Sequence, residues 1–384
     1  MYTIRAHPII SQVITVLQIF GMWHKDEEST FSKIGKKMIN SIMLVSLFAS
    51  LSSGAYLSGD MNESVYLSAA TVASALLVVK LGYILSKQHE INEFLNDICV
   101  HSIEDVNEFD EINIKLENFA KFGYINVFSM LLAIFLFIIL SLPFFSSERR
   151  LPLNVGFPLD WKNSIVGYCL AHTFVVAAVI FAMVVTFFTI IYWYVMFNCS
   201  IKYQLLGNSL RKLGSKNSAA KNVFDKQETV EDLKKLIESH RNIKEKTASF
   251  KACFSNLFLA QIFTSNLCIC GSLYGLAFSS ENNLIQTVIN CVILIYNTFD
   301  IFVVMYFGNE IKYHYSQLIY CLFESDWINQ LDTVKRNIII LTEVLKQPQD
   351  LVILKLYPMN LETFTSIVKL TYSMFNILQK FGKK

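Results

Sequence analysis

Seven apolar stretches dominate this chain of 384 residues. Crossing about 30 Å of hydrocarbon as a helix takes roughly 20 mostly apolar residues. Hydrophobic residues make up 53% of the chain and charged residues 17%, whereas soluble domains lie near about 45–50% and about 25%. The sequence therefore predicts an all-α membrane protein with seven transmembrane helices, at 38–57, 65–85, 125–145, 168–197, 254–278, 284–307 and, more weakly, 361–378.

The segments between these spans differ in their content of Lys and Arg. One alternate set of segments holds 25 of them and the other set holds 6, with Lys80 and Lys369 inside spans. Cytoplasmic loops carry the excess of basic residues. The richer set includes residues 1–37 and 198–255, so the N-terminus is predicted to be cytoplasmic and the C-terminus extracellular.

The chain offers little support for catalysis or for a bound cofactor. No nucleophile elbow, metal-binding His-Glu motif or glycine-rich phosphate loop is present, so no enzymatic activity is expected. The eight cysteines are scattered and none falls in a predicted external loop, which predicts neither a disulfide nor a metal site. A net charge of +2 gives no reason to expect binding to nucleic acid. Membrane lipid is expected to surround the spans.

Two parts of the chain are predicted. Residues 1–308 form a six-span region with a cytoplasmic extension at 198–253, and residues 309–384 form cytoplasmic helices followed by the last span. Two helices are expected before that span, at 309–327 and 332–346. The first carries an apolar stripe of Ile311, Tyr315, Leu318, Ile319 and Leu322. This stripe must be buried in a small cytoplasmic bundle or at a subunit interface, and we favour the interface.

The last span has a polar face. At 100° per residue, one arc of about 140° carries Glu362, Thr365, Ser366, Lys369, Tyr372, Ser373, Asn376, Gln379 and Lys380. Charges within a bilayer are costly, so this arc is expected to face protein or water. A pore-lining helix repeated around an axis explains it, and so does a buried or surface-lying helix in a monomer.

Two ionisable side chains fall inside other spans. Lys80 and Asp300 are predicted at similar depth. Either the two form an ion pair or Lys80 extends to the inner headgroups, and the ion pair is the less favoured of the two. Asn62 begins a glycosylation sequon in the first external loop.

Small and aromatic residues share the outer halves of several spans, where they leave room for an apolar ligand with one or two polar anchors. Ordinary helix packing is the alternative interpretation of each. The candidate ligand-binding residues are Tyr66, Ala70, Ile138, Leu142, Tyr168, His172, Val176, Leu267, Gly271 and Tyr274.

Four motifs follow one another near the C-terminus: YFGNE at 306–310, ESDW at 324–327, LKQP at 345–348 and LETFTSIVKLTYSMF at 361–375. In these motifs and in its seven inverted spans the chain resembles the insect odorant receptor family. Phe323 and Thr371 depart slightly from the usual pattern. The cytoplasmic insert between the fourth and fifth spans is shorter than that of the family's shared co-receptor, so the chain resembles a tuning subunit.

The resemblance implies a ligand-gated, non-selective cation channel in the plasma membrane of a sensory neuron dendrite. It implies a heterotetramer with the odorant co-receptor, a small volatile organic ligand in the outer half, and cytoplasmic helices that anchor the subunits together. Tyr372, Phe375 and Gln379 match positions at the pore or gate. A gustatory receptor channel and a G-protein-coupled receptor are the alternatives; the loop charge disfavours the latter.

Overall fold

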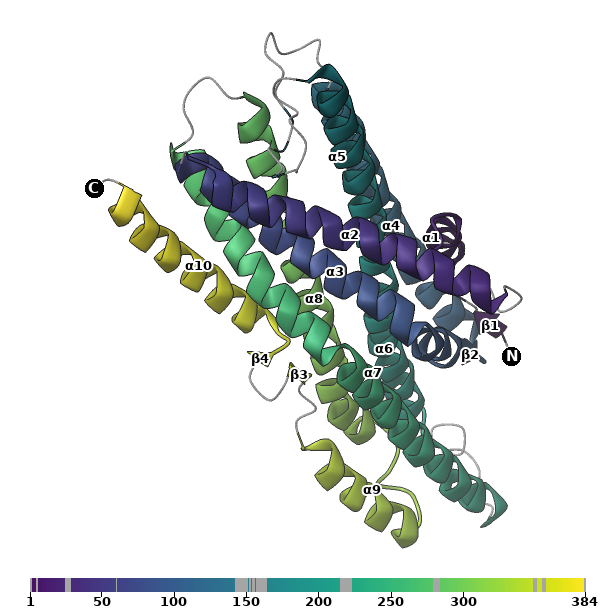
Figure 1. Cartoon of the computed structure of the whole chain (residues 1–384). Helices are drawn as coiled ribbons and strands as arrows, with labels where there is room; N and C mark the ends of the chain where they lie inside the picture. The colour runs from purple at the N-terminus through teal and green to yellow at the C-terminus, as the bar shows by residue number, and fades with distance from the viewer. Residues whose placement is uncertain are drawn as a thin grey trace.

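The computed structural model is almost wholly helical (Figure 1). It describes residues 2–4, 6–24, 29–59, 61–141, 151, 153, 156, 164–214, 223–278, 284–347, 351–353 and 357–382. The elements in chain order are β1 (Tyr2–Ile4), α1 (Pro8–Ile19), α2 (Thr30–Leu57), α3 (Met61–Asp97), β2 (His101–Ile103), α4 (Val106–Ser141), α5 (Ile165–Thr186), α6 (Phe188–Arg211), α7 (Val223–Phe278), α8 (Leu284–Phe323), α9 (Asp332–Leu345), β3 (Val352–Ile353), β4 (Tyr357–Pro358) and α10 (Leu361–Gly382).

Six helical segments of the described chain are long and apolar enough to cross a membrane. They coincide with the first six predicted spans, except that the fourth is divided into α5 and α6 by a turn at Phe187. The seventh prediction corresponds to α10, whose polar arc keeps it out of that apolar set. The prediction of an all-α membrane protein is confirmed.

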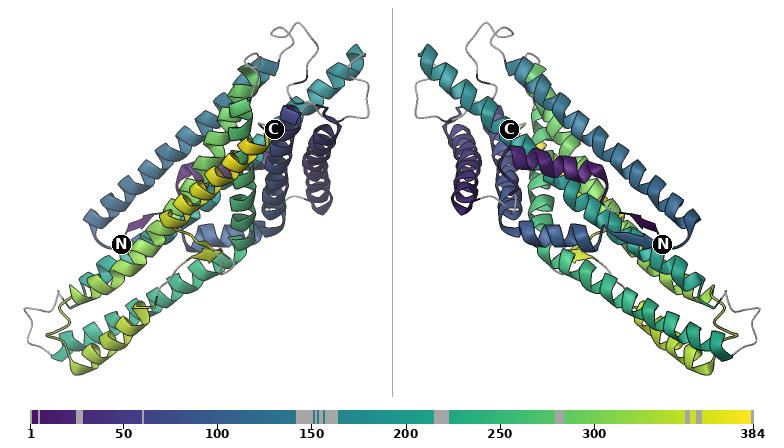
Figure 2. Two further views of the ribbon diagram at one scale, coloured as in Figure 1. Left: turned by 90° about the vertical axis from the view of Figure 1, so that its left-hand side faces the viewer. Right: turned by 90° about the vertical axis from the view of Figure 1, so that its right-hand side faces the viewer.

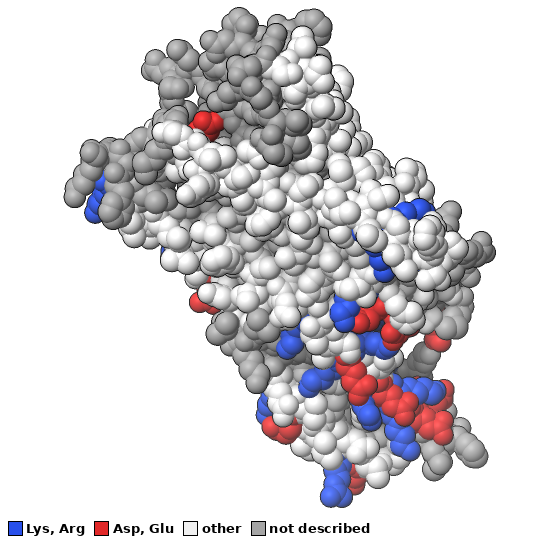
Figure 3. Space-filling model, in the orientation of Figure 1, with Lys and Arg blue, Asp and Glu red and all other residues white. Residues whose placement is uncertain are grey.

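Most spans extend beyond the predicted limits. The 56 residues of α7 and the 40 of α8 exceed the roughly 20 that a bilayer requires. Their extra turns, with the end of α6 and with α9, project past the rest of the bundle, away from the free end of α10 (Figure 2). Lys, Arg, Asp and Glu gather at this end, and the surface beside it is nearly free of them (Figure 3).

The apolar stripe expected at a subunit interface is instead buried within the chain. Ile311, Tyr315, Leu318 and Leu322 are buried, and α8 contacts α6, α7 and α9. The preference for an interface was therefore wrong for this stripe, because the extensions of α6 and α7, together with α9, cover it. Other apolar side chains stay exposed at this end, among them Ile339 and Ile340 on α9.

The N-terminal segment contains a helix that the sequence interpretation missed. Pro8 occupies the first turn of α1, and the His7 ring accepts a hydrogen bond from the Ile9 backbone N–H at 3.3 Å. The His7 backbone N–H donates to the Tyr194 hydroxyl at 2.9 Å. A Cβ on Gly123 would lie 2.5 Å from the Ile9 side chain, so the glycine lets α1 lie against α4.

A short antiparallel pair, β1 with β2, fixes the chain before α1 to the α3–α4 connection. His101 in β2 is buried, and its Nε2 lies 2.8 Å from Asn198 Oδ1 on α6. Burial lowers the pKa of His101 to about 4, so this ring is uncharged at neutral pH.

A buried ion pair joins the helices at the centre of the bundle. Lys80 Nζ on α3 lies 3.2 Å from Asp300 Oδ2 on α8, and the two side chains are 1% and 2% exposed. Lys80 also donates to Thr189 Oγ1 at 3.0 Å, and the Tyr192 hydroxyl lies 3.4 Å from Asp300 Oδ1. The ion pair that the sequence allowed is present, and the alternative in which Lys80 extends to the headgroups is wrong.

We predict that losing one partner of this pair destabilises the protein far more than losing both. Lys80→Met or Asp300→Leu alone leaves a buried charge without a counter-ion, which costs about 3–5 kcal/mol. The double variant removes both charges and should recover most of the lost stability. Thermal unfolding in detergent measures this, and a double variant less stable than either single variant would contradict it.

Candidate functional site

The predicted ligand-binding residues are mostly buried or half-buried. Tyr66, Tyr168 and Tyr274 are buried. The half-buried residues are Ala70, Ile138, His172, Val176, Leu267 and Gly271. Leu142 lies outside the described residues. The candidate residues thus come from α3, α4, α5 and α7.

The structure brings the candidates on α3 and α7 together. The Cys268 thiol donates to the Ala69 carbonyl at 3.5 Å, and a Cβ on Gly271 would lie 3.0 Å from the Cβ of Ala69. Residues 66–70 and 267–274 therefore occupy facing helix surfaces. Gly271 has a packing role here, because its missing side chain allows the two helices to approach.

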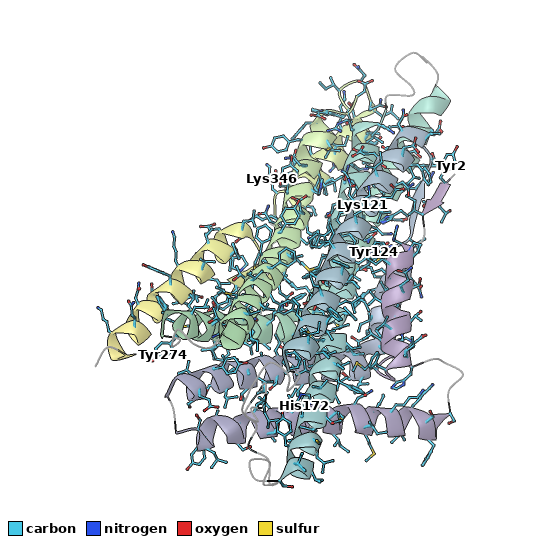
Figure 4. All side chains as sticks on the ribbon, turned by 90° about the horizontal axis from the view of Figure 1, so that it is seen from above. Tyr2, Lys121, Tyr124, His172, Tyr274 and Lys346 are labelled. Atoms are coloured by element: carbon cyan, nitrogen blue, oxygen red, sulfur yellow. The ribbon has the colours of Figure 1, made fainter. Side chains whose placement is uncertain are left out.

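The candidates on α5 form a second group. The rings of Tyr168 and His172 lie 5.9 Å apart, one turn from each other. Because α5 and α7 both contact α3, α3 is the common neighbour of the two groups. Figure 4 shows His172 on α5 and Tyr274 near α10.

Several buried polar atoms near these helices lack a protein partner. The Tyr66 hydroxyl, Ser272 Oγ and Asn290 Nδ2 have no hydrogen bond to any described residue. Asn290 lies on α8 against α7, since a Cβ on Gly275 would be 2.5 Å from its Nδ2. Buried polar groups are normally hydrogen-bonded, so atoms of this kind are suited to anchor a ligand.

Ser272 and Asn290 were not among the candidates from the sequence. The signal that could have found them is a polar residue in the outer half of an apolar span, but such residues often bond to their own helix. Ser272 and Asn290 differ from such residues in being buried and in having a side-chain atom with no hydrogen-bond partner among the described residues.

Grooves elsewhere do not include the predicted ligand-binding residues. One of about 420 Å³ lies between α4, α6 and α8 and is walled by aromatic rings, among them Phe119, Phe197 and Phe302. Another, of about 560 Å³, lies between the later turns of α3 and the middle of α7, beside Lys87 and Glu93. The described residues contain no cluster of His, Cys, Asp or Glu that could hold a metal ion.

The last helix, α10, is attached to the bundle by one face only. Thr363, Ile367 and Thr371 are buried at intervals of four residues, and α10 contacts α7 and α8. A glycine is needed at position 308 of α8, because a Cβ there would lie 2.6 Å from the carbonyl oxygen of Met359, just before α10.

The polar arc of α10 points away from the chain's own helices, with Thr365, Ser366, Lys369 and Ser373 exposed. Tyr372 is 62% exposed. Phe375 and Gln379 are half-buried. The interpretation of α10 as a helix buried on all sides in one subunit is therefore wrong.

The Asn62 sequon lies at the start of α3, which begins at Met61, earlier than the predicted span. Its backbone is helical, and its side chain lies outside the described part of the structure. Its glycosylation stays a prediction.

A family model and the similar proteins found by comparison all point to odorant receptors. A family model described as 7tm Odorant receptor matches residues 60–372. Odorant receptor 23a of Drosophila melanogaster is 27% identical over 63% of this chain and 62% of its own length, so the chain spans less than two thirds of that relative. Odorant receptor 22a of the same fly is 23% identical over 96% of this chain and 91% of its own.

Two solved structures share the fold. The insect olfactory receptor OR5 from Machilis hrabei superposes with a TM-score of 0.78 at 17% identity, over 96% of this chain and 97% of its own. The same receptor in complex with eugenol gives 0.80 at 15% identity, over 98% of each chain. The similarity covers the whole arrangement, α10 included, and is that of a seven-transmembrane fold.

We predict that Tyr66→Phe separates ligand recognition from stability. Removing a buried hydroxyl without a partner should leave the melting temperature unchanged or raised. If that hydroxyl bonds to the ligand, responses to an oxygen-bearing odorant should weaken by about 2- to 12-fold. Dose–response curves measure this, and a hydrocarbon of the same size is the control whose potency should not change. Equal loss of potency for both would argue against the hydroxyl as an anchor.

Proposed function

Because the chain belongs to the seven-transmembrane odorant receptor family, we propose that it is a tuning subunit of an odorant-gated, non-selective cation channel. Members of this family are receptors rather than enzymes. The observation that carries the channel proposal is the exposed polar arc of α10. In a bilayer this arc requires water or a partner subunit, and a central aqueous pore supplies both.

The proposed ligand is a small volatile organic molecule bound in the outer half of the bundle. The buried Tyr66, Ser272 and Asn290 supply polar atoms that have no hydrogen-bond partner within the described part of the chain. The eugenol complex of OR5 supports this proposal, because eugenol is an odorant-sized molecule bound to a protein of the same fold. Affinity then depends mainly on shape, with about 1–3 kcal/mol per well-placed group.

The proposed orientation places the charged end in the cytoplasm. The loop bias of 25 basic residues to 6 supports an N-terminus inside and a C-terminus outside. In this orientation α9, the end of α6, the start of α7 and the end of α8 lie inside, at the end of the molecule where charged side chains gather (Figure 3). The orientation disfavours a G-protein-coupled receptor.

The proposed assembly is a heterotetramer with the odorant co-receptor in a sensory neuron dendrite. Residues 1–308 bind ligand, and residues 309–384 supply the anchor and the pore. The exposed Ile339 and Ile340 on α9 and Ile328 beside it are apolar surface in a water-facing region, which favours a subunit contact there.

In the pore, Tyr372 and Gln379 face the permeating ions and Phe375 contributes to an apolar constriction. Phe375 and Gln379 are half-buried and lie at the border between the polar arc and the face of α10 that packs on α7 and α8. A modest rotation of α10 would therefore change how far Phe375 enters the pore.

We predict that water-soluble thiol reagents alter the current through channels containing Tyr372→Cys or Gln379→Cys. Met374→Cys, on the other side of the helix, is the matched control and should react more slowly. Gln379→Glu should also change divalent permeation or block, because it adds a charge along the ion path. Equal reaction rates at all three cysteine positions, in open and closed channels, would rule out a pore-lining α10.

A further inference from the structure

The face of α10 that lies on the bundle contains a polar contact. Thr371 is 2% exposed, and its hydroxyl donates to Asn266 Oδ1 on α7 at 2.6 Å, with the Ile367 carbonyl of its own helix as a longer second acceptor at 3.0 Å. Among the described residues this is the one side-chain hydrogen bond between α10 and another helix. The neighbouring contacts of α10 are apolar, such as the rings of Phe364 and Phe302, 5.4 Å apart. The hydrogen bond therefore gives the interface a preferred rotation, which apolar contacts alone specify weakly.

Thr371 is placed where it must respond to rotation of α10. Phe375 lies four residues further along, just over one turn away on the same side, and Tyr372 is the next residue. Any rotation that moves Phe375 into or out of the pore also moves the Thr371 hydroxyl relative to Asn266.

The other side of α7 carries a second polar contact. Gln261 lies five residues before Asn266, about 140° around the helix, and its Oε1 accepts a hydrogen bond from the Tyr192 hydroxyl at 3.0 Å. Tyr192 lies beside Asp300, the partner of Lys80. Thus α7 is bonded to the central ion-pair cluster on one face and to α10 on the other.

We propose that the Thr371–Asn266 hydrogen bond is a gating contact that sets the balance between the open and closed orientations of α10. The inference rests on the proposed channel function. The contact is made in one orientation and lost in the other, so its free energy contributes directly to the gating equilibrium. Thr371 and Asn266 act by positioning the helix, and neither needs to touch the ligand or the ions.

The test is a double-variant cycle in channels formed with the co-receptor. The quantity measured is the ratio of current without odorant to current at a saturating concentration of the most effective odorant in a panel. Thr371→Val keeps the shape and removes the hydroxyl, and Asn266→Leu removes the acceptor. Each should change the ratio by about 3- to 20-fold in the same direction, the factor expected for one hydrogen bond inside a membrane protein.

Three further results test whether the hydrogen bond itself sets the gating equilibrium. The double variant should change the ratio no more than one single variant does, because both remove the same bond. Thr371→Ser retains the hydroxyl and should restore the wild-type ratio. Thr298→Val is the matched control and should leave the ratio unchanged, since Thr298 lies on α8 outside the polar arc and its hydroxyl donates to the Leu294 carbonyl of its own helix at 2.8 Å.

A purely structural role would lower the amount of protein at the cell surface and leave the ratio unchanged, and that result would overturn the proposal. Additive effects of the two single variants would overturn it as well. Absence of odorant current in the wild-type channel is a different outcome, because it refutes the proposed function itself.

Discussion

The Lys80–Asp300 ion pair constrains every helix near it. A charge buried in a bilayer without a partner is expensive, so α3 and α8 keep the relative positions that hold the two groups 3.2 Å apart. Thr189 and Tyr192 bring α6 into the same cluster, and Tyr192 reaches Gln261 on α7. Four helices thus share one polar centre, which fixes their register more firmly than apolar contacts alone.

The two functional regions lie on either side of this centre. The candidate ligand-binding residues on α3 and α7 occupy the half toward the start of α3, and the charged extensions occupy the other half. Through Asn266, α7 also carries the contact to α10. A ligand that altered the packing of α3 on α7 would therefore act on a helix that is bonded to the proposed pore helix. This arrangement would let ligand binding act on the proposed pore helix without a separate signalling protein.

Much of the fold followed from local properties of the sequence. Apolar length locates the spans, and placing the last span at 100° per residue predicted the exposed polar arc of α10. The helix expected at 332–346 is α9. The helix α1 was missed because its stability depends on distant partners, namely Tyr194 and the gap left by Gly123. The turn at Phe187 was also missed, since no glycine or proline marks it.

The site was less predictable than the fold. Tyr66 and Gly271 were both candidates for the pocket, but one has a buried hydroxyl without a partner and the other packs against Ala69. Nothing local to either residue distinguishes these roles, because each depends on which residue of another helix lies opposite. Thr371 gave a similarly weak signal, since a hydroxyl in a helix usually bonds to its own backbone.

The central claim is that this chain and the co-receptor together contain the pore. Outside-out patches from cells expressing both, perfused on the inner face with solution free of nucleotides, test it most directly. If the pore is intrinsic, an odorant active on whole cells opens channels in such patches within the time of solution exchange. Patches that stay silent while whole cells respond would contradict it and would favour a receptor that signals through a second messenger.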